Sequence, residues 1–315
     1  MYNKIVEFSR KIGLPVKKIL DVFSYLKNID RVENFDLICK TGIAKATINS
    51  VKEYFSDIFG EASTFTKIDK SKIEELNSIY SNNYQEDEKL LNLQPVDKLH
   101  DILLKRVKPN REYDQFIATQ ETVGNRAGLL KHFADIDEKR LIFIGDDDFT
   151  SVAAAMSGKA KEIVVLDIDG RILNTINDIS KKNSLNITTI KHDLSKALPS
   201  QLLNRFDVVF TDPPYTSEGI RLFLSRAIST IDSNNLSGRI YLCYGNSDRA
   251  KERFLPIYRS IIDSGLMLRY VFDKFNRYTG AESIGSSSSL FILDVTPKVK
   301  ALIKGDYENS IYTND

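Results

Sequence analysis

The sequence predicts an α/β protein whose parallel sheet is covered by helices on both faces, preceded by a smaller helical domain. After Glu138, short and fully apolar runs alternate with amphipathic segments, a pattern typical of buried parallel strands separated by helices. Between Val6 and Phe59, apolar residues recur at helical spacing instead. At 315 residues the chain is long enough for two domains.

The strands and helices of the larger domain are expected in regular alternation. The parallel strands are predicted at Arg140–Ile144, Glu162–Asp167, Ile187–Lys191, Phe206–Thr211 and Arg239–Tyr244. Helices are predicted near Thr122–Phe133, Thr150–Gly158, Arg171–Lys181 and Glu218–Ile231. Two late strands, Met267–Phe272 and Ser288–Asp294, are expected to close the sheet as an antiparallel pair.

The N-terminal segment has the pattern of a helix-turn-helix. One helix is expected to end near Cys39, a turn passes through Thr41 and Gly42, and a second helix carries Lys45 and Lys52. Both a DNA-binding winged helix and a small helical domain for dimerisation or for covering an active site fit this pattern. The segment lacks a stripe of basic residues that would attract nucleic acid. This favours the small helical domain for dimerisation or for covering an active site.

Three regions are expected along the chain. Residues 1–85 form the helical, winged-helix-like domain, and residues 86–296 form the α/β domain with a preceding connector. Residues 297–315 are polar and are predicted to be a flexible tail. We expect this tail and the Gly/Ser-rich segment Thr279–Ser289 to gate a binding site.

The composition argues against several functional classes. Lys and Arg number 44 against 43 Asp and Glu, so a formal net charge of +1 gives no overall field for nucleic acid or an anionic membrane. Cys39 and Cys243 are too far apart in sequence for a disulfide framework, and His100, His132 and His192 lack metal-site spacing. No apolar stretch resembles a signal peptide or a membrane span. We therefore expect a cytoplasmic protein without a metal site.

The most informative motif follows the first parallel strand and reads Gly145-Asp146-Asp147-Asp148. Ligands of open α/β sheets bind beyond the carboxyl ends of the strands, where a glycine-rich turn usually approaches a phosphate or a carboxylate. Three carboxylates there would repel an anion and attract a cation. An exposed helix cap is the alternative, although Thr150 and Ser151 could cap equally well.

Two further strand ends carry carboxylates suited to a nucleoside. Asp167 ends the second strand at the offset from Gly145 where an acidic residue receives ribose hydroxyls, with Asp169 as the second choice. Asp193 follows the third strand and could accept a hydrogen bond from an adenine amino group. A local Asx-turn explains Asp193 equally well.

The fourth strand ends in Asp212-Pro213-Pro214-Tyr215. The prolines fix the backbone, so that a carboxylate and an aromatic ring face one substrate atom together. This pair suits an amine, because Asp212 accepts N–H bonds and Tyr215 offers a π face to positive charge. Upstream, Asp114 and Gln115 could add polar contacts from a lid, although an ordinary surface loop is as good an explanation.

These motifs together resemble the branched-chain polyamine synthases, also called N4-bis(aminopropyl)spermidine synthases. The resemblance rests on GDDDFTS, VVLDID and FTDPPYT in order and extends over about 111–294. It implies a Rossmann-like methyltransferase/aminopropyltransferase sheet, a winged-helix-like N-terminal domain and a homodimer. The implied reaction moves aminopropyl groups from decarboxylated S-adenosylmethionine, the co-substrate, to spermidine, releases methylthioadenosine and needs no prosthetic group.

The chemistry of that reaction suits the acidic motifs. Both co-substrates are cations, so negative charge is needed to bring them together. The acceptor amine must also lose a proton before it attacks. We expect Asp148 to be the base, with Asp146 or Asp147 binding the ammonium group of the donor.

Two other functions remain open at this point. Asp212-Pro213-Pro214-Tyr215 also resembles the motif of adenine-amino methyltransferases, so the protein could use S-adenosylmethionine to methylate an amino group of nucleic acid. The carboxylate of S-adenosylmethionine would then face three aspartates, which argues against it. A DNA-binding regulator with a degenerate enzyme domain rests on the helix-turn-helix alone.

Overall fold

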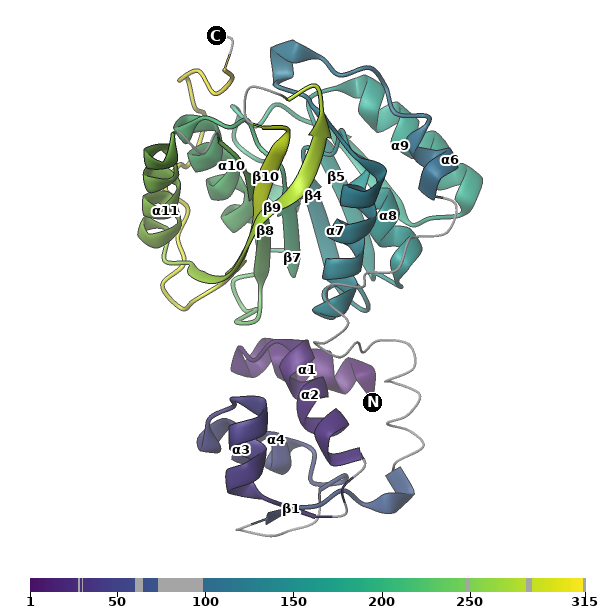
Figure 1. The fold of residues 1–315 in the computed structure, drawn as a ribbon, viewed down its shortest axis with the longest axis vertical. Coiled ribbons are helices and arrows are strands. Elements are labelled where there is room, and N and C mark those ends of the chain that lie inside the picture. The colour runs from purple at the N-terminus through teal and green to yellow at the C-terminus, as the bar shows by residue number, and fades with distance from the viewer. Residues whose placement is uncertain are drawn as a thin grey trace.

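The computed structural model describes residues 1–27, 29, 31–59, 65–72, 99–246, 250–281 and 285–313. Figure 1 shows a small helical body formed by the N-terminal residues and a larger α/β body. The predicted domain boundary between residues 85 and 86 lies outside the described residues.

In the described part of the chain, the larger body is built on an eight-stranded sheet in the order β3-β9-β10-β8-β7-β4-β5-β6. Its strands are β3 (Ile117–Ala118), β4 (Arg140–Ile144), β5 (Glu162–Asp167), β6 (Ile187–Lys191), β7 (Val208–Thr211), β8 (Arg239–Tyr244), β9 (Met267–Thr279) and β10 (Ser287–Asp294). The five strands from β8 to β6 in this order run parallel, whereas β10, β9 and β3 join antiparallel. The predicted sheet and its antiparallel pair are thereby confirmed.

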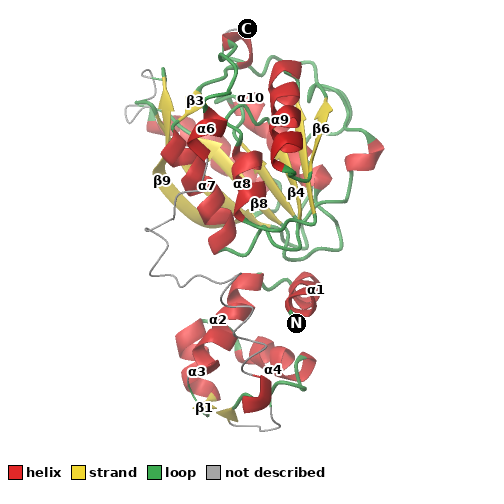
Figure 2. Cartoon of the chain, turned by 90° about the vertical axis from the view of Figure 1, so that its right-hand side faces the viewer, coloured by secondary structure: helices red, strands yellow, loops and turns green. Residues whose placement is uncertain are grey.

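Helices cover both faces of the sheet, as the apolar strands require. They are α6 (Leu99–Leu103), α7 (Gln120–His132), α8 (Thr150–Ser157), α9 (Gly170–Asn183), α10 (Ser217–Thr230) and α11 (Phe254–Asp263), with 3-10 turns η3 (Arg111–Tyr113), η4 (Ser200–Leu202) and η5 (Lys251–Arg253). Figure 2 shows α6 to α9 on the near face. Successive side chains of β4 point to opposite faces of the sheet. Phe143 packs with α7, α8 and α9, whereas Ile142 and Ile144 pack with α10 and α11.

The hairpin of β9 and β10 differs from the prediction in length. Strand β9 extends to Thr279, well past the expected end at Phe272. Its pairing with β10 contains register shifts, and Lys274 has a positive φ of 52°. Because of these irregularities and the charged residues Asp273 and Lys274, the second half of the strand does not show the alternation of apolar and polar residues that predicts a strand. The extra length brings Asn276 and Tyr278 to the carboxyl edge of the parallel strands.

The small body consists of α1 (Tyr2–Ile12), α2 (Val16–Lys27), α3 (Asn34–Thr41) and α4 (Lys45–Tyr54), a turn η1 (Lys70–Lys72) and the strands β1 (Val32–Glu33) and β2 (Phe65–Thr66). The strands β1 and β2 pair antiparallel. Between α3 and α4, Gly42 takes a φ of 66°, so the predicted turn is present. The winged-helix-like assignment stays a prediction.

Arg10 of α1 connects the two bodies. It forms ion pairs with Asp207 and, at 2.6 Å, with Asp232. Asp207 directly precedes β7, so this contact lies at the amino edge of the parallel strands. The described small body therefore attaches to the edge opposite the acidic turn (Figure 1), which argues against one of the alternatives for it, a cover over the site.

The C-terminal segment packs against the α/β body, although we expected a flexible tail at 297–315. Ile303 and Ile311 are buried in the core that contains α10. The Tyr307 N–H donates to the Ser195 carbonyl at 2.7 Å, and the Thr216 hydroxyl donates to the Ile311 carbonyl at 2.7 Å. These contacts carry the segment to the carboxyl edge of the sheet. In the described residues, no helix combines the length and the apolarity needed to cross a membrane.

Candidate active site

The acidic turn, Gly145–Asp148, joins β4 to α8 at the carboxyl edge of the sheet. Gly145 takes a φ of 71°, a conformation that glycine adopts without a Cβ clash, and its N–H donates to the Leu166 carbonyl at 2.8 Å. This hydrogen bond ties the turn to β5. The backbone thus presents the three aspartates in three different environments.

Asp146 points into the protein and is 3% exposed. Its carboxylate accepts hydrogen bonds from the Ser151 N–H at 3.2 Å and from the Ser151 hydroxyl in the first turn of α8. Burial raises the pKa of Asp146 to about 8, against the opposing effect of the Ser151 hydrogen bonds. Asp146 thus has the helix-capping contacts that were the alternative explanation for this motif, and it is absent from the walls of the cavities below.

Asp148 is also buried, at 2% exposure, and it is paired with positive charge. It accepts from the Ala118 N–H at 2.6 Å and from Arg126 Nη1 at 2.8 Å, with Arg106 Nη1 at 3.8 Å. Burial raises the pKa of Asp148, and Arg126 works in the opposite direction. Because it is paired and does not line either cavity, its geometry does not favour the expected role as the base.

Asp147 is the member of the turn that faces ligand space. It lines both cavities at the carboxyl edge. No hydrogen bond or ion pair joins its carboxylate to another of the described residues. Burial and the negative charges of Asp148 and Asp212 raise its pKa well above the usual value. This is the pattern of a carboxylate available to a ligand.

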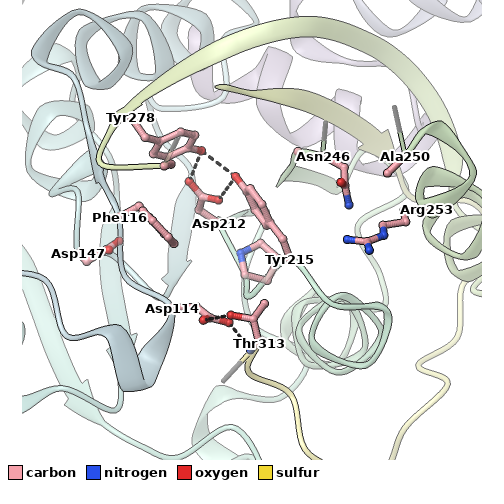
Figure 3. A pocket seen from close by; sticks show the side chains of 13 residues that line it. Asp114, Phe116, Asp147, Asp212, Tyr215, Asn246, Ala250, Arg253, Tyr278 and Thr313 are labelled. Atoms are coloured by element: carbon pink, nitrogen blue, oxygen red, sulfur yellow. Dashed lines mark hydrogen bonds between the residues drawn. The ribbon is translucent and has the colours of Figure 1, made fainter. Parts of the chain in front are cut away.

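Asp212 and Tyr215, after β7, form one hydrogen-bonded unit with Tyr278 of β9 (Figure 3). Asp212 accepts from the Tyr215 hydroxyl at 2.9 Å, the Tyr278 hydroxyl at 2.7 Å and Arg126 Nη2 at 2.6 Å. The two tyrosine hydroxyls lie 2.8 Å apart. Burial raises the pKa of both tyrosines, so they stay neutral donors at ordinary pH.

The larger of the two cavities has a volume of about 350 Å³. Figure 3 shows its walls, which are formed by Asp114, Phe116, Asp147, Asp212, Pro213, Tyr215, Gly245, Asn246, Ala250, Arg253, Tyr278, Ala281 and Thr313. Three carboxylates and one arginine lie on this wall, so the cavity has acidic and aromatic character. Such a site suits a cationic ligand.

The smaller cavity has a volume of about 70 Å³ and lies among the ends of β4, β5, β6 and β7. It shares Asp114, Asp147, Asp212 and Pro213 with the larger cavity. Gly145, Gln115, Asp167 and Pro214 of the predicted set line it as well, together with Ile311 and Tyr312 of the C-terminal segment. The two cavities therefore adjoin at the acidic residues of both motifs.

Asp167 lies where a ribose-binding residue is expected. Its carboxylate accepts from the Asp146 N–H at 3.0 Å and the Asp169 N–H at 2.8 Å, which fixes its direction. Asp169, the second choice, pairs instead with Arg171 at 2.5 Å and accepts from Gln115 Nε2 at 3.3 Å. The arrangement favours Asp167 over Asp169.

Asp193 does not reach the smaller cavity. Its carboxylate accepts from the Ser195 N–H at 2.8 Å in a local turn, which was the alternative explanation, and the neighbours His192 and Leu194 line the cavity instead. Among the described residues, nothing hydrogen-bonds to the buried Nε2 atom of His192. His192 therefore replaces Asp193 as the candidate for a polar contact with a ligand.

Asp114 is held by the C-terminal segment. Its carboxylate accepts from the Thr313 N–H at 2.8 Å and from the Thr313 hydroxyl (Figure 3). Asp114 and Thr313 both line the larger cavity, whereas Gln115 lines the smaller one. The predicted lid residues are thus present at the site, and the C-terminal segment completes its wall.

Sequence reasoning missed Arg126, Tyr278 and Thr313. Arg126 lies on α7 among the buried residues Val123, Ala127 and Leu130. A charged residue on the apolar stripe of a helix is a signal that could have been found. Nothing local marks Tyr278 or Thr313, because long-range packing brings both to the site. Among the described residues, no group of three His, Cys, Asp or Glu side chains is placed to hold a metal ion.

The order and direction of the strands identify the fold class. A sheet that runs β6-β5-β4-β7-β8 in parallel and ends in the antiparallel β10 and β9 is the methyltransferase-like form of the doubly wound fold. Its cavities lie at the carboxyl ends of the strands, where that fold binds nucleosides.

Comparison with known proteins narrows the class to a family. Residues 94–313 match the branched-chain polyamine synthase A C-terminal domain. This match covers more than half of the chain, so the chain belongs to the branched-chain polyamine synthase family.

Two relatives come from Methanocaldococcus jannaschii. An uncharacterised protein, MJ0675, is 42% identical over 64% of this chain and 49% of its own length. An N(4)-bis(aminopropyl)spermidine synthase is 32% identical over 58% of this chain and 52% of its own length. The matched part therefore spans about half the length of these curated relatives.

A solved structure extends the likeness to the whole fold. The branched-chain polyamine synthase from Thermus thermophilus, in complex with N4-aminopropylspermidine and 5'-methylthioadenosine, superposes with a TM-score of 0.63. It covers 100% of this chain and 98% of that one at 18% identity. At this identity the likeness concerns the fold.

Proposed function

We propose that the protein transfers aminopropyl groups from decarboxylated S-adenosylmethionine to spermidine, makes N4-bis(aminopropyl)spermidine and releases methylthioadenosine. The observation that carries this proposal is Asp147, a carboxylate without a partner among the described residues, on the wall that two adjoining cavities share. The name of the M. jannaschii relative and the two ligands in the T. thermophilus structure support it.

The donor nucleoside is assigned to the smaller cavity. Asp167 would accept hydrogen bonds from the ribose hydroxyls. His192 Nε2, which has no hydrogen-bond partner among the described residues, is available to the adenine ring. A volume of about 70 Å³ is well below the ~300–1,000 Å³ of ordinary ligand pockets. Donor binding therefore requires the smaller cavity to widen.

The acceptor is assigned to the larger cavity. Asp114, Asp147 and Asp212 offer negative charge to a polyamine, and the ring of Tyr215 offers its π face. Decarboxylated S-adenosylmethionine has no carboxylate, so its sulfonium and ammonium groups can both lie near Asp147. The carboxylate of S-adenosylmethionine would be repelled there.

In the transfer step, the lone pair of the acceptor nitrogen forms a bond to the carbon attached to the sulfonium. The carbon–sulfur bond breaks, and its electrons return to sulfur in neutral methylthioadenosine. A protonated secondary amine loses one proton before the first attack, and the resulting tertiary amine loses one before the second, which leaves a quaternary nitrogen. Each transfer thus releases one proton, which a base must accept.

Asp147 is proposed as this base in place of Asp148. Asp147 faces both cavities without a partner among the described residues, and its raised pKa makes its ionised form a stronger proton acceptor than an ordinary aspartate carboxylate. Asp148 and Asp212 are paired with Arg126 and are assigned to holding the site. No step of this chemistry requires a metal or a prosthetic group.

Mass spectrometry of the products tests the proposal. The protein is incubated with decarboxylated S-adenosylmethionine and spermidine, and two successive aminopropyl additions with equal amounts of methylthioadenosine are expected. A parallel reaction contains S-adenosylmethionine with duplex DNA or RNA. Methylated nucleic acid without an aminopropylated product would replace the proposal by the methyltransferase alternative.

We also propose that residues 1–85 form a winged-helix-like domain, that residues 86–296 form the catalytic domain together with the C-terminal segment packed on them, and that the protein is a homodimer. The antiparallel pair β1–β2 beside the helix-turn-helix supports the first of these assignments. Limited proteolysis tests the boundary, and light scattering tests the dimer. A single mass equal to one chain would contradict the dimer.

A further inference from the structure

Arg126 lies between the two acidic motifs and is fully enclosed. It is 1% exposed and comes from α7, which carries no part of either motif. Its Nη1 atom donates to Asp148 at 2.8 Å and its Nη2 atom to Asp212 at 2.6 Å. One guanidinium therefore joins the turn after β4 to the turn after β7.

The remaining donors of Arg126 fix it in a closed ring of hydrogen bonds. Its Nε atom donates to Asn276 Oδ1 at 2.8 Å, and Asn276 Nδ2 donates to the Ser288 hydroxyl at 2.9 Å. Ser288 lies 2.8 Å from the Tyr278 hydroxyl, which donates to Asp212 at 2.7 Å and so closes the ring. Such a ring leaves the guanidinium a single position.

The charge of Arg126 matters because Arg126 lies beside a largely buried cluster of acidic residues. The titratable groups near Asp147 include Asp146 and Asp148 of its own turn, Asp167 at the end of β5, Asp212 after β7 and Arg106 after α6. Asp114 and Arg253 line the larger cavity together with Asp147. Asp146 holds a proton below about pH 8, but the carboxylates of the other residues outnumber the arginines and would oppose a further negative charge. Arg126 adds a positive charge to the cluster, and it is placed on the two carboxylates that lie next to Asp147.

We infer that Arg126 is a positioning residue that balances the charges of Asp148 and Asp212, and thereby allows Asp147 to lose its proton and act as the base. This inference rests on the proposed role of Asp147. Arg126 lines neither cavity and so has no contact with the ligand space. Its effect on the reaction therefore passes through the carboxylates.

The test is a carbon-13 NMR titration of the aspartate carboxyl carbons, with the Asp147 signal assigned from its loss in D147N. It is carried out on wild type, R126Q, R126K and the charge-balanced double variant R126Q/D148N. R126Q should move the titration midpoint of Asp147 upward by about one pH unit or more, because two neighbouring carboxylates lose their counter-charge. R126K and the double variant should keep the midpoint close to that of wild type.

R239Q is the matched control. Arg239 is also buried, at 2% exposure, and pairs with Asp135 at 2.8 Å and Asp294 at 2.9 Å, away from both cavities. It should lower the melting temperature and leave the Asp147 midpoint unchanged. If R126Q fails to fold, D148N and R126Q/D148N decide the question: D148N should lower the midpoint, and adding R126Q should restore it.

An unchanged midpoint in folded R126Q, or a double variant that departs from wild type as far as R126Q does, would overturn the inference. This readout needs no turnover. Failure of the proposed function would instead be seen as wild-type protein that forms no aminopropylated product, so the two failures are distinguishable.

Discussion

Two buried arginines at opposite edges of the sheet show what separates a structural charge cluster from a reactive one. Arg239, at the start of β8, pairs with Asp135 and Asp294, and Arg126, at the carboxyl edge, pairs with Asp148 and Asp212. Each therefore balances two carboxylates. The difference lies in Asp147, a further carboxylate beside the Arg126 cluster that lines both cavities and has no partner among the described residues.

The paired carboxylates of both clusters support the fold, whereas Asp147, which has no partner among the described residues, is the acid proposed to act in the reaction. Three consecutive aspartates look equivalent in the sequence. In the structure Asp146 binds the start of α8, Asp148 binds Arg126, and Asp147 faces the ligand space. The premise that an acidic pocket brings two cations together therefore rests mainly on Asp147, since Arg126 offsets much of the remaining negative charge.

The largest expected effect comes from D147N. Removing the base should lower kcat by ~10²–10⁴-fold, because the acceptor amine can no longer pass its proton to the protein. Steady-state release of methylthioadenosine measures this loss. Calorimetry should show methylthioadenosine binding within a few-fold of wild type, and a rate close to wild type would remove Asp147 from the mechanism.

R239Q should greatly lower the stability of the protein and change its activity little. Breaking a buried ion pair leaves uncompensated charge and typically costs ~3–5 kcal/mol of the free energy of unfolding. Denaturant unfolding measures this loss. Below the melting temperature of the variant, kcat should stay within a few-fold of wild type. A large loss of kcat in well-folded protein would show that Arg239 also acts on the reaction.

The pH dependence of stability tests Asp146. Burial raises its pKa to about 8, whereas in the unfolded chain it titrates at the ordinary value near 4. Between these values the folded protein holds a proton that the unfolded chain has lost, so its contribution to the free energy of unfolding falls as the pH rises. The slope for one proton is ~1.4 kcal/mol per pH unit at most.

The D146N variant isolates this contribution. Its carboxamide can still accept from the Ser151 N–H but does not titrate, so its stability should decline less between pH 4 and pH 8 than that of wild type. Denaturant midpoints across this range measure the difference. Parallel curves for the two proteins would show that Asp146 does not hold the extra proton.

The smallest expected effect concerns the exposed pairing of Asp114 with Thr313. Exposed polar contacts contribute only ~0–1 kcal/mol, so T313A should change kcat little. It should loosen the C-terminal segment over the smaller cavity and change the KM for the donor by about two- to five-fold, since ~1 kcal/mol corresponds to about a five-fold change in binding. T296A, directly before this segment and away from the cavities, is the control. Equal effects of both variants would count against a role for the Asp114–Thr313 contact in donor binding.

Much of the fold could be predicted from the sequence, because β4, β5, β7 and β8 are largely apolar runs that can be recognised without knowledge of distant contacts. Strand β9 could not be followed beyond Phe272, since register shifts and charged residues interrupt its alternation. The packing of the C-terminal segment was missed because it depends on only a few buried residues, among them Ile303 and Ile311. Hydrophobic patterns in the sequence therefore predict local elements well, but they do not predict a few contacts between distant parts of the chain.

For the site, the sequence identified the motifs but not the division of work within them. Which aspartate of the turn faces the ligand depends on Ser151 and Arg126, and the contact with Arg126 is made across the fold. The sequence fits both a nucleoside contact and a local turn at Asp193; in the structure the local turn uses its carboxylate, and His192 lines the cavity instead. The acidic residues of the site could be predicted from their type and their position after the strands. Their hydrogen-bond and ion-pair partners could not, because these depend on packing.

The most direct test of the central claim is a crystal structure of the protein with methylthioadenosine and spermidine. The nucleoside should occupy the space beside Asp167, and the central nitrogen of spermidine should lie within ~2.6–3.2 Å of a carboxylate oxygen of Asp147. Arg126 should remain bound to Asp148 and Asp212. A central nitrogen held by Asp148, or placed beyond the reach of Asp147, would contradict the account.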